Sequence, residues 1–174
     1  MTNIKGDRVV LRAVEPSDVN WLYSWENDVD VWPVSGTLSP FSHHTLSQFI
    51  EAQREDIYSS RQLRLMISTL DESSVVGVVD LFEFDPHNLR AGVGIMIAPA
   101  FRRLGYAADA LLSLERYASN FLRVHQLWCN VEEDNKASLA LFTSLGYVSI
   151  GVKRDWNISP EGYKSEVIFQ KIIE

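Results

Sequence analysis

The feature that most constrains the fold is the stretch 93–114, where an apolar strand pattern changes to a helical one. Residues 95–97 form an apolar run typical of a buried strand. Pro99 ends that run because proline donates no hydrogen bond to a sheet ladder. Apolar residues then recur every three or four positions, which predicts a helix over about 106–121 with one face packed on the sheet. These residues are Ala107, Ala110, Leu111, Leu114 and Ala118.

The turn before this helix has the composition of an anion-binding loop. No Ser, Thr, Asp or Asn stands at the N-cap position, so the first backbone N–H groups of the helix need another partner. Gly105 lets the backbone approach a ligand, Ala107 leaves room for it, and Arg102 and Arg103 add positive charge. This combination predicts a cradle for a phosphate or pyrophosphate. The alternative is an ordinary strand-to-helix connection with a water-capped helix end and solvated arginines.

The length and the hydrophobic content predict one globular domain over residues 1–174. Of the 174 residues, 46% are hydrophobic, which is enough for one substantial core. No window approaches the roughly 20 apolar residues needed to cross a bilayer. Residues 1–8 lack the apolar region of a signal peptide. We therefore expect a cytoplasmic protein that does not contact a membrane.

The charged and metal-ligating residues argue against two further classes. The net charge of −7 is opposite to that of a general nucleic-acid binder and is compatible with cationic substrates. Cys129 is the single cysteine, which excludes an internal disulfide and predicts a buried thiol. His43 and His44 lack a carboxylate or cysteine at ligand spacing, so no metal site is predicted.

The order of the patterns predicts an α/β (α+β mixed) fold. Strands are expected at 8–12, 63–69, 75–84, 90–98, 126–131, 147–152 and 163–172. Helices are expected from Glu15, over 45–58 with Ser42 as cap, over 106–121 and over 135–145, with a loop or short helical turns at 26–42. This order predicts a central, mostly antiparallel mixed sheet of about seven strands with helices on both faces.

Two motifs resemble those of the GCN5-related N-acetyltransferase (GNAT) superfamily. Residues 102–107 match the family's Arg/Gln-x-x-Gly-x-Gly/Ala acetyl-coenzyme A motif, and they too follow a strand and open a helix. Downstream, 125–131 resembles the family's next strand, and 135–147 resembles its Asn followed by a helix that ends in Leu-Gly-aromatic. The nearest resemblance is to bacterial spermidine or diamine N-acetyltransferases and to ribosomal-protein N-terminal acetyltransferases.

The resemblance implies acetyl-coenzyme A (acetyl-CoA) as co-substrate. Its pantetheine arm would lie where strands 95–98 and 128–131 splay apart at a bulge, and its pyrophosphate would lie on the predicted cradle. Asn135, which otherwise reads as a helix N-cap, would contact the pantetheine or the thioester. The implied cofactor-binding residues are Ile95, Met96, Ile97, Arg102, Arg103, Leu104, Gly105, Tyr106, Ala107, Asn135 and Phe142.

The resemblance also implies direct attack of an amine on the thioester. A primary amine with a pKa near ~10.4 is protonated at neutral pH, so a base or a water must take a proton. Glu83 is the expected base, because relatives that acetylate spermidine carry Glu in the sequence matching Asp80-Leu-Phe-Glu83. A plain solvated carboxylate is the alternative. Gly92 stands where other relatives carry a carboxylate, so that second route to a base is missing.

Phe142 departs from the family pattern, because most relatives place a tyrosine there as proton donor to the departing thiolate. Tyr147, Tyr106, Ser138 or a water are alternative donors, or no acid is used. Losing one proton donor typically slows an enzyme about 10² to 10⁴-fold without abolishing its activity. A protein that binds acetyl-CoA without turning it over is the remaining explanation.

The expected acceptor is a primary amine, with a polyamine or diamine such as spermidine as the best match. Residues 80–107 resemble the spermidine branch without insertion, although the loop 30–41 lacks the paired Glu residues with which that branch holds polyamine nitrogens. Trp32 and Phe41 suit a more apolar ligand. A peptide N-terminus or another small-molecule amine is the competing acceptor, and a non-catalytic acetyl-CoA-binding module is the alternative of another class. A homo-oligomer is compatible with the sequence.

Overall fold

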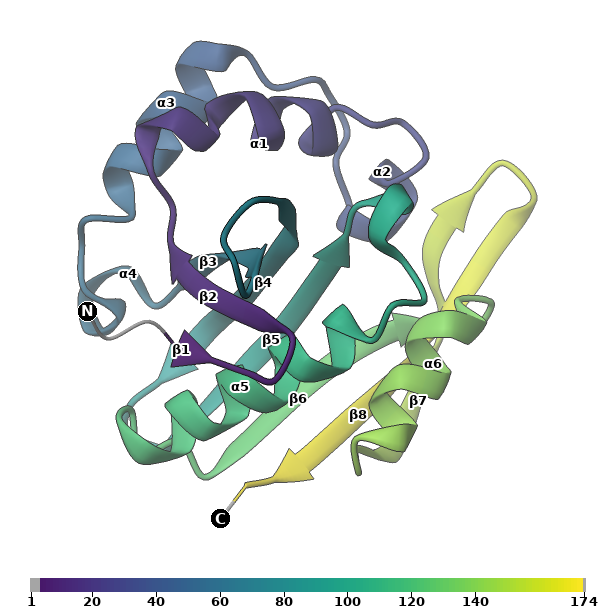
Figure 1. The fold of residues 1–174 in the computed structure, drawn as a ribbon. Coiled ribbons are helices and arrows are strands. Elements are labelled where there is room, and N and C mark those ends of the chain that lie inside the picture. The colour runs from purple at the N-terminus through teal and green to yellow at the C-terminus, as the bar shows by residue number, and fades with distance from the viewer. Residues whose placement is uncertain (1–3, 174) are drawn as a thin grey trace.

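A mixed sheet forms the centre of the protein (Figure 1). The computed structural model describes residues 4–173. The sheet has eight strands in the order β1-β2-β3-β4-β5-β6-β8-β7, and all neighbours are antiparallel except β5 and β6, which are parallel. The strands are β1 (Ile4–Lys5), β2 (Val9–Ala13), β3 (Leu63–Thr69), β4 (Val75–Asp85), β5 (Arg90–Ile97), β6 (Gln126–Glu132), β7 (Val148–Ser159) and β8 (Gly162–Ile172).

Helices cover both faces of this sheet, as the sequence predicted. They are α1 (Val19–Glu26), α2 (Trp32–Ser35), α3 (His43–Ala52), α4 (Ile57–Ser60), α5 (Tyr106–Asn120) and α6 (Lys136–Ser144), with 3-10 turns at Pro16–Asp18 and Pro99–Phe101. Figure 1 shows α1 and α3 on one side of the sheet and α5 and α6 on the other.

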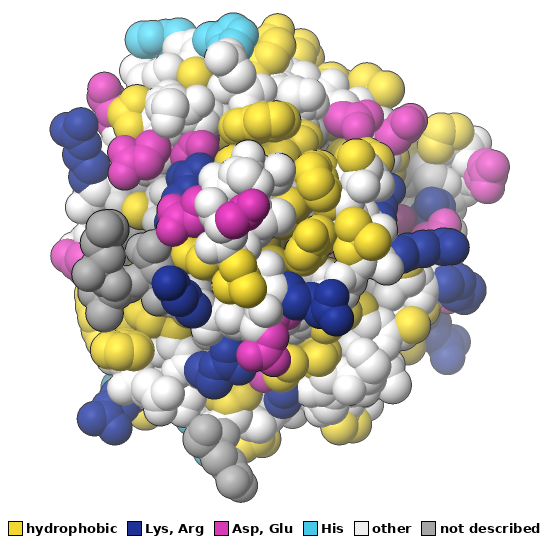
Figure 2. Space-filling model, viewed as in Figure 1, with side chains coloured by type: hydrophobic (Ala, Val, Ile, Leu, Met, Phe, Trp, Pro, Cys, Tyr) yellow, Lys and Arg dark blue, Asp and Glu magenta, His cyan; other side chains and the backbone are white. Residues whose placement is uncertain are grey.

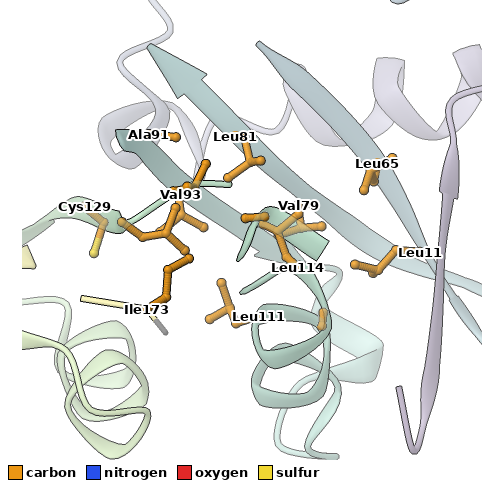
Figure 3. Packing of buried hydrophobic residues seen from close by; sticks show 14 of the residues in the cluster. Leu11, Leu65, Val79, Leu81, Ala91, Val93, Leu111, Leu114, Cys129 and Ile173 are labelled. Atoms are coloured by element: carbon orange, nitrogen blue, oxygen red, sulfur yellow. The ribbon is translucent and has the colours of Figure 1, made fainter. Parts of the chain in front are cut away.

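The larger core lies on the α5 face. Leu111 and Leu114 of α5 are fully buried and point toward Val79 and Val93 of the sheet (Figure 3). Cys129 of β6 belongs to the same cluster and is 2% exposed, so the predicted buried thiol is confirmed. Burying apolar side chains on this scale is the dominant stabilising contribution to such a fold.

A smaller core lies on the opposite face, where α1 and α3 pack on the sheet. Leu22 and Trp25 of α1 meet Ile50 of α3, and together they cover Met66 and Val78 of the strands beneath. This second core places the end of α1 and the side chains of α3 close to β3 and β4, which matters for the site described below.

The structure differs from the predicted elements at three places. The expected helix over 45–58 is wrong: α3 begins after its Ser42 cap as predicted, but ends at Ala52. Asp56 then caps the separate α4 by accepting from the backbone N–H groups of Tyr58 and Ser59, and such side chains favour caps over helix interiors. The eighth strand is the two-residue β1. Finally, β7 runs to Ser159, beyond the predicted 147–152. The sequence pattern missed this extension because register shifts interrupt the alternation of side chains along the strand.

Candidate active site

A gap between β5 and β6 organises the candidate site. The two strands pair only at Arg90–Gln126, Ala91–Leu127 and Gly92–Trp128. Beyond these pairs, β5 remains paired with β4 and β6 remains paired with β8, but the two do not pair with each other. The predicted splay is therefore present. Backbone groups along the gap are available to an extended ligand that carries amides of its own.

The loop that begins α5 lies at the end of β5 and has the geometry of an anion cradle. Gly105 is the N-cap residue of α5 in the left-handed conformation, with φ of 82°, and no side chain caps the helix there. Arg103 is also left-handed, with φ of 62°. Within residues 4–173, the N–H groups of Leu104, Gly105, Tyr106 and Ala107 donate no hydrogen bond. Free donors and the positive helix end favour a bound phosphate.

The two predicted arginines occupy different positions around this loop. Arg102 folds back, and its Nε donates to the Ile97 carbonyl at 3.1 Å, so its guanidinium lies where β5 ends. Arg103 is exposed, as is Leu104. Basic side chains lie on the face of the molecule that carries α5, with acidic side chains among them (Figure 2).

Arg8 is a further basic residue at the cradle that sequence reasoning missed. A Cβ on Gly105 would lie 3.5 Å from the Cδ and Nε atoms of Arg8. The turn that carries Arg8 is held to α5 by Asp109, whose carboxylate accepts from the N–H groups of Asp7, Arg8 and Val9 at 3.0, 2.8 and 3.0 Å. Since Arg8 and Asp109 are 101 positions apart, no local pattern signals their contact.

Asn135 and Phe142 lie on α6, on the other side of the gap. Asn135 is the N-cap residue of α6, and its Oδ1 accepts from the Ser138 N–H at 3.1 Å, which leaves its amide nitrogen as a donor. Phe142 is 4% exposed and packs against Tyr147 and Phe169, with ring centroids 5.0 and 6.4 Å away. Phe142 thus contributes an apolar wall and no proton.

Tyr147 is poorly suited to protonate a thiolate. Its side chain is 3% exposed, and its hydroxyl has no hydrogen-bond partner among residues 4–173. Burial and the nearby Glu115 carboxylate raise the pKa of Tyr147 far above its usual range. The other donors considered above, Tyr106 and Ser138, lie in the first turns of α5 and α6.

On the α1/α3 face, the strands beside the gap present a hollow. Gly92 and Gly94 of β5 both lie on this face, opposite Phe82 and Asp80 of β4. The Phe82 ring lies over Gly92 and meets Trp128 of β6 edge to face, with centroids 5.2 Å apart. A Cβ on Gly94 would make an ordinary van der Waals contact with Phe82, at 3.7 Å, and would meet no other atom within 4 Å, so a small side chain fits over Gly94.

Glu83 lies at an irregularity of β4. The register of β4 on β5 shifts between Phe82 and Asp85, and Glu83 has a left-handed φ of 48°. The resemblance implied a bulge where β5 and β6 splay apart, whereas this irregularity lies in β4, in its pairing with β5. Glu83 is exposed and lies beside the paired end of β5 and β6. Its role as base stays a prediction.

Sequence reasoning also missed an ion-pair triad next to the hollow. Arg64 of β3 donates from Nε and Nη2 to the two carboxylate oxygens of Asp80, at 2.7 and 3.0 Å, and from Nη1 to Glu26 of α1. Burial opposes the charged guanidinium, but the two carboxylates outweigh it and raise the pKa of Arg64. The only sequence signal was the carboxylate at position 80.

Neither a metal site nor a membrane-spanning helix is found among residues 4–173. No group of three or more His, Cys, Asp or Glu side chains in this range could hold a metal ion. None of the helices there is both long enough and apolar enough to span a bilayer.

An α+β sheet with a splayed parallel pair and an uncapped helix after the first strand of that pair defines a class of binding site for a ligand that carries both amides and a diphosphate. The model of the family described as "Acetyltransferase (GNAT) domain" matches residues 8–148. The chain therefore belongs to the GNAT family and is an N-acetyltransferase, for which the family implies acetyl-CoA as donor.

Individual relatives are distant. The chain is 24% identical over 157 residues to the uncharacterised N-acetyltransferase p20 of Bacillus licheniformis, covering 90% of this chain and 88% of that protein. It is 22% identical over 142 residues to spermidine N(1)-acetyltransferase of Escherichia coli (strain K12), covering 80% and 72%. The crystal structure of spermidine N-acetyltransferase from Vibrio cholerae in complex with CoA and spermine superposes with a TM-score of 0.86 at 19% identity, covering 95% of both chains. The structural match confirms the GNAT fold.

Proposed function

We propose that this protein transfers the acetyl group of acetyl-CoA to a primary amine, and that a polyamine or diamine such as spermidine is the acceptor. The observation that carries the proposal is the continuity of the gap between β5 and β6 with the free amides at the start of α5. A gap that offers strand edges and ends at an anion cradle suits an extended amide chain attached to a diphosphate.

Each part of the site would hold one part of the co-substrate. The N–H groups of 104–107, with Arg102, Arg103 and Arg8, would bind the pyrophosphate. The backbone of Ile95, Met96 and Ile97 would pair with the pantetheine arm, although Arg102 already occupies the Ile97 carbonyl. The Asn135 amide nitrogen and the Phe142 ring would border the thioester end.

Acetyl-CoA supplies an activated acetyl group, whose carbonyl carbon forms the new C–N bond as the C–S bond breaks. The protein must bind the amine next to that carbon and let one proton leave the nitrogen. Glu83 is our candidate for accepting that proton through water, given its exposure at the bulge of β4. Because Phe142 carries no proton and Tyr147 is a weak acid, the thiolate, with a pKa near ~8.5, would leave unprotonated or would take a proton from Tyr106, Ser138 or a water.

The acceptor choice is supported by the likeness to proteins named as spermidine acetyltransferases. A peptide N-terminus or another small amine competes with it, because the loop 30–41 lacks paired Glu residues for polyamine nitrogens and carries Trp32 and Phe41 instead. Both aromatic residues are anchored: the Trp32 ring N–H donates to the Glu26 carbonyl, and the backbone of Phe41 is hydrogen-bonded to the Asn27 side chain. They therefore help to shape this side of the molecule instead of supplying charged groups for a polyamine.

One assay separates these acceptors. Purified protein is mixed with acetyl-CoA and with spermidine, putrescine, aminoglycosides, amino acids or N-terminal peptides, and free thiol is measured. We expect spermidine or a diamine to give the fastest release. Fastest release with a peptide would replace the polyamine assignment. Acetyl-CoA binding with no release above the blank for any acceptor would leave the non-catalytic module as the better account.

The remaining partner and location assignments are proposals of the same kind. A homo-oligomer is supported by the long unpaired edge of β7, where Trp156 and Ile158 are exposed, and sedimentation velocity tests it. Cytoplasmic location is tested by cell fractionation. One domain over 1–174 also remains a prediction, and residues 1–3 and 174 lie outside the described residues.

A further inference from the structure

The Asp80 carboxylate is the acidic group best placed beside the open end of the gap. Along β4, Asp80 shares a face with Val78 and Phe82, and this is the face covered by α1 and α3. Its partner across the register is Gly94, two positions beyond the last pair that joins β5 to β6. Because Gly94 has no side chain, the β5 residue opposite Asp80 places no side chain between Asp80 and the gap.

This carboxylate is held in one orientation. Arg64 donates to both of its oxygens, as a planar guanidinium does in a bidentate pair. Glu26 binds the remaining side of the same guanidinium. Two carboxylates share one positive charge, so the triad carries a net charge of −1. The side chains of Glu26, Arg64 and Asp80 are 22%, 20% and 24% exposed, so a solute can reach them.

A small cavity adjoins the triad. It has a volume of about 190 Å³ and is lined in part by Phe49, Arg64, Asp80 and Phe82. The Arg64 guanidinium lies 5.1 Å from the centre of the Phe49 ring. The cavity thus combines aromatic walls with the Asp80 carboxylate, and Glu26, on the other side of Arg64, adds a second negative charge nearby; this suits the carbon chain next to a protonated amine.

We propose that Asp80 binds the ammonium group of the acceptor at the mouth of the gap, and that Arg64 and Glu26 are positioning residues that act through Asp80. This inference rests on the proposed acetyltransferase function and names its acceptor class: a primary ammonium on an aliphatic or arylalkyl body.

The test compares Asp80→Asn with Glu83→Gln, because the second variant removes a neighbouring carboxylate from the same strand. With acetyl-CoA saturating, Asp80→Asn should raise the KM for the amine by about tenfold or more while changing kcat by less than about threefold. The Kd for acetyl-CoA should not change. Glu83→Gln should leave the amine KM near the wild-type value and lower kcat instead. The inference is overturned if Glu83→Gln raises the KM more than Asp80→Asn does.

A binding measurement keeps the test independent of turnover and of folding damage. Hexylamine and hexanol are titrated into CoA-saturated protein, and wild type should bind the ammonium at least about tenfold more tightly than the alcohol. Asp80→Asn should lose that preference, whereas general damage to the cavity would weaken both ligands alike. Glu26→Gln retains the Asp80–Arg64 pair and should reduce the preference about threefold. An unchanged preference in Asp80→Asn would contradict the inference.

The two proposals fail in different ways. If acetyl-CoA binds and amines are acetylated while Asp80→Asn behaves as wild type, only the role of Asp80 falls. If hexylamine preference depends on Asp80 but no amine is acetylated, the acceptor site stands and the transfer reaction falls.

Discussion

The two faces of the sheet at the gap are assembled in different ways. On the α5 face, the cradle comes almost entirely from the contiguous segment 102–107, placed by the end of β5 and the start of α5. On the opposite face, Glu26, Arg64 and Asp80 come from α1, β3 and β4 and meet only in the folded chain. A site formed by one contiguous segment can be recognised in the sequence, whereas a site assembled from three separate segments can be recognised only in the structure.

The alkylation rate of a cysteine thiol should differ most between the two faces of the sheet. Neighbouring side chains of a strand point to opposite faces, so Cys129 lies in the α5-face core and Asn130 faces the other side. Burial raises the pKa of the Cys129 thiol to about 12. At pH 8, alkylation of wild-type protein should therefore be on the order of 10³-fold slower than that of the urea-denatured chain, and slower than that of Asn130→Cys, whose position is partly exposed. Comparable rates in the native state would contradict this description of the two faces.

The same pKa shift has a consequence for stability. The ordinary thiol pKa of 9.0 applies to the unfolded chain and about 12 to the folded one, so the neutral thiol is favoured by folding. Its contribution is complete below pH 9 and is lost as the pH rises toward 12. Urea unfolding of wild type and Cys129→Ala as a function of pH measures it: because Tyr147 lowers the stability of both variants at high pH, the contribution of Cys129 is the additional loss that wild type should show between pH 9 and 12.

The cradle should be the most sensitive site for donor binding. Gly105→Val places a branched side chain where the phosphate would lie and should weaken acetyl-CoA binding by about 100-fold or more, equivalent to about 2.7 kcal/mol. Gly36→Val is the matched control, because Gly36 is also left-handed, with φ of 71°, but has no neighbour within 4 Å of its Cβ position. Both variants carry similar backbone strain, so equal loss of affinity by calorimetry would refute the cradle.

The two glycines of β5 sharpen the description of the acceptor face. A Cβ on Gly92 would lie 2.3 Å from the Phe82 ring, which must then leave its contact with Trp128. We expect Gly92→Ala to lower the free energy of unfolding by about 1–3 kcal/mol, and Gly94→Ala to change it by less than about 0.5 kcal/mol. Denaturant unfolding of both variants decides the matter, and equal stabilities would mean that the hollow is misplaced.

Arg8 should have the smallest effect. It is exposed and acts on a bound anion only through screened charge, so Arg8→Gln should weaken acetyl-CoA binding about threefold to tenfold at low salt. The difference should shrink as salt is added. Arg54→Gln, which removes an exposed arginine after α3, serves as control and should change nothing. If the two variants are indistinguishable at low salt, Arg8 does not belong to the cradle.

These contrasts show which features of the fold and of the candidate site could be predicted from the sequence. The sequence predicted the mixed sheet, the uncapped start of α5 and the Asn135 cap, because each depends on local periodicity or on capping chemistry, whereas the splay was implied by the resemblance to the family. It did not predict Arg8 at Gly105 or the Arg64 triad, whose Arg64–Glu26 contact spans 38 positions. It named Glu83 as the base from the match to relatives but did not predict the bulge at Glu83, because a left-handed residue has no signature in a simple alternation of side chains.

The central claim is that the start of α5 binds the diphosphate of acetyl-CoA. The most direct test is calorimetry with acetyl-CoA and with acetylpantetheine, which shares the thioester and the arm but lacks the diphosphate. We expect acetyl-CoA to bind at least about 100-fold more tightly, and the difference to disappear in Gly105→Val. Equal affinities for the two ligands in wild-type protein, or no measurable binding of acetyl-CoA, would contradict the account.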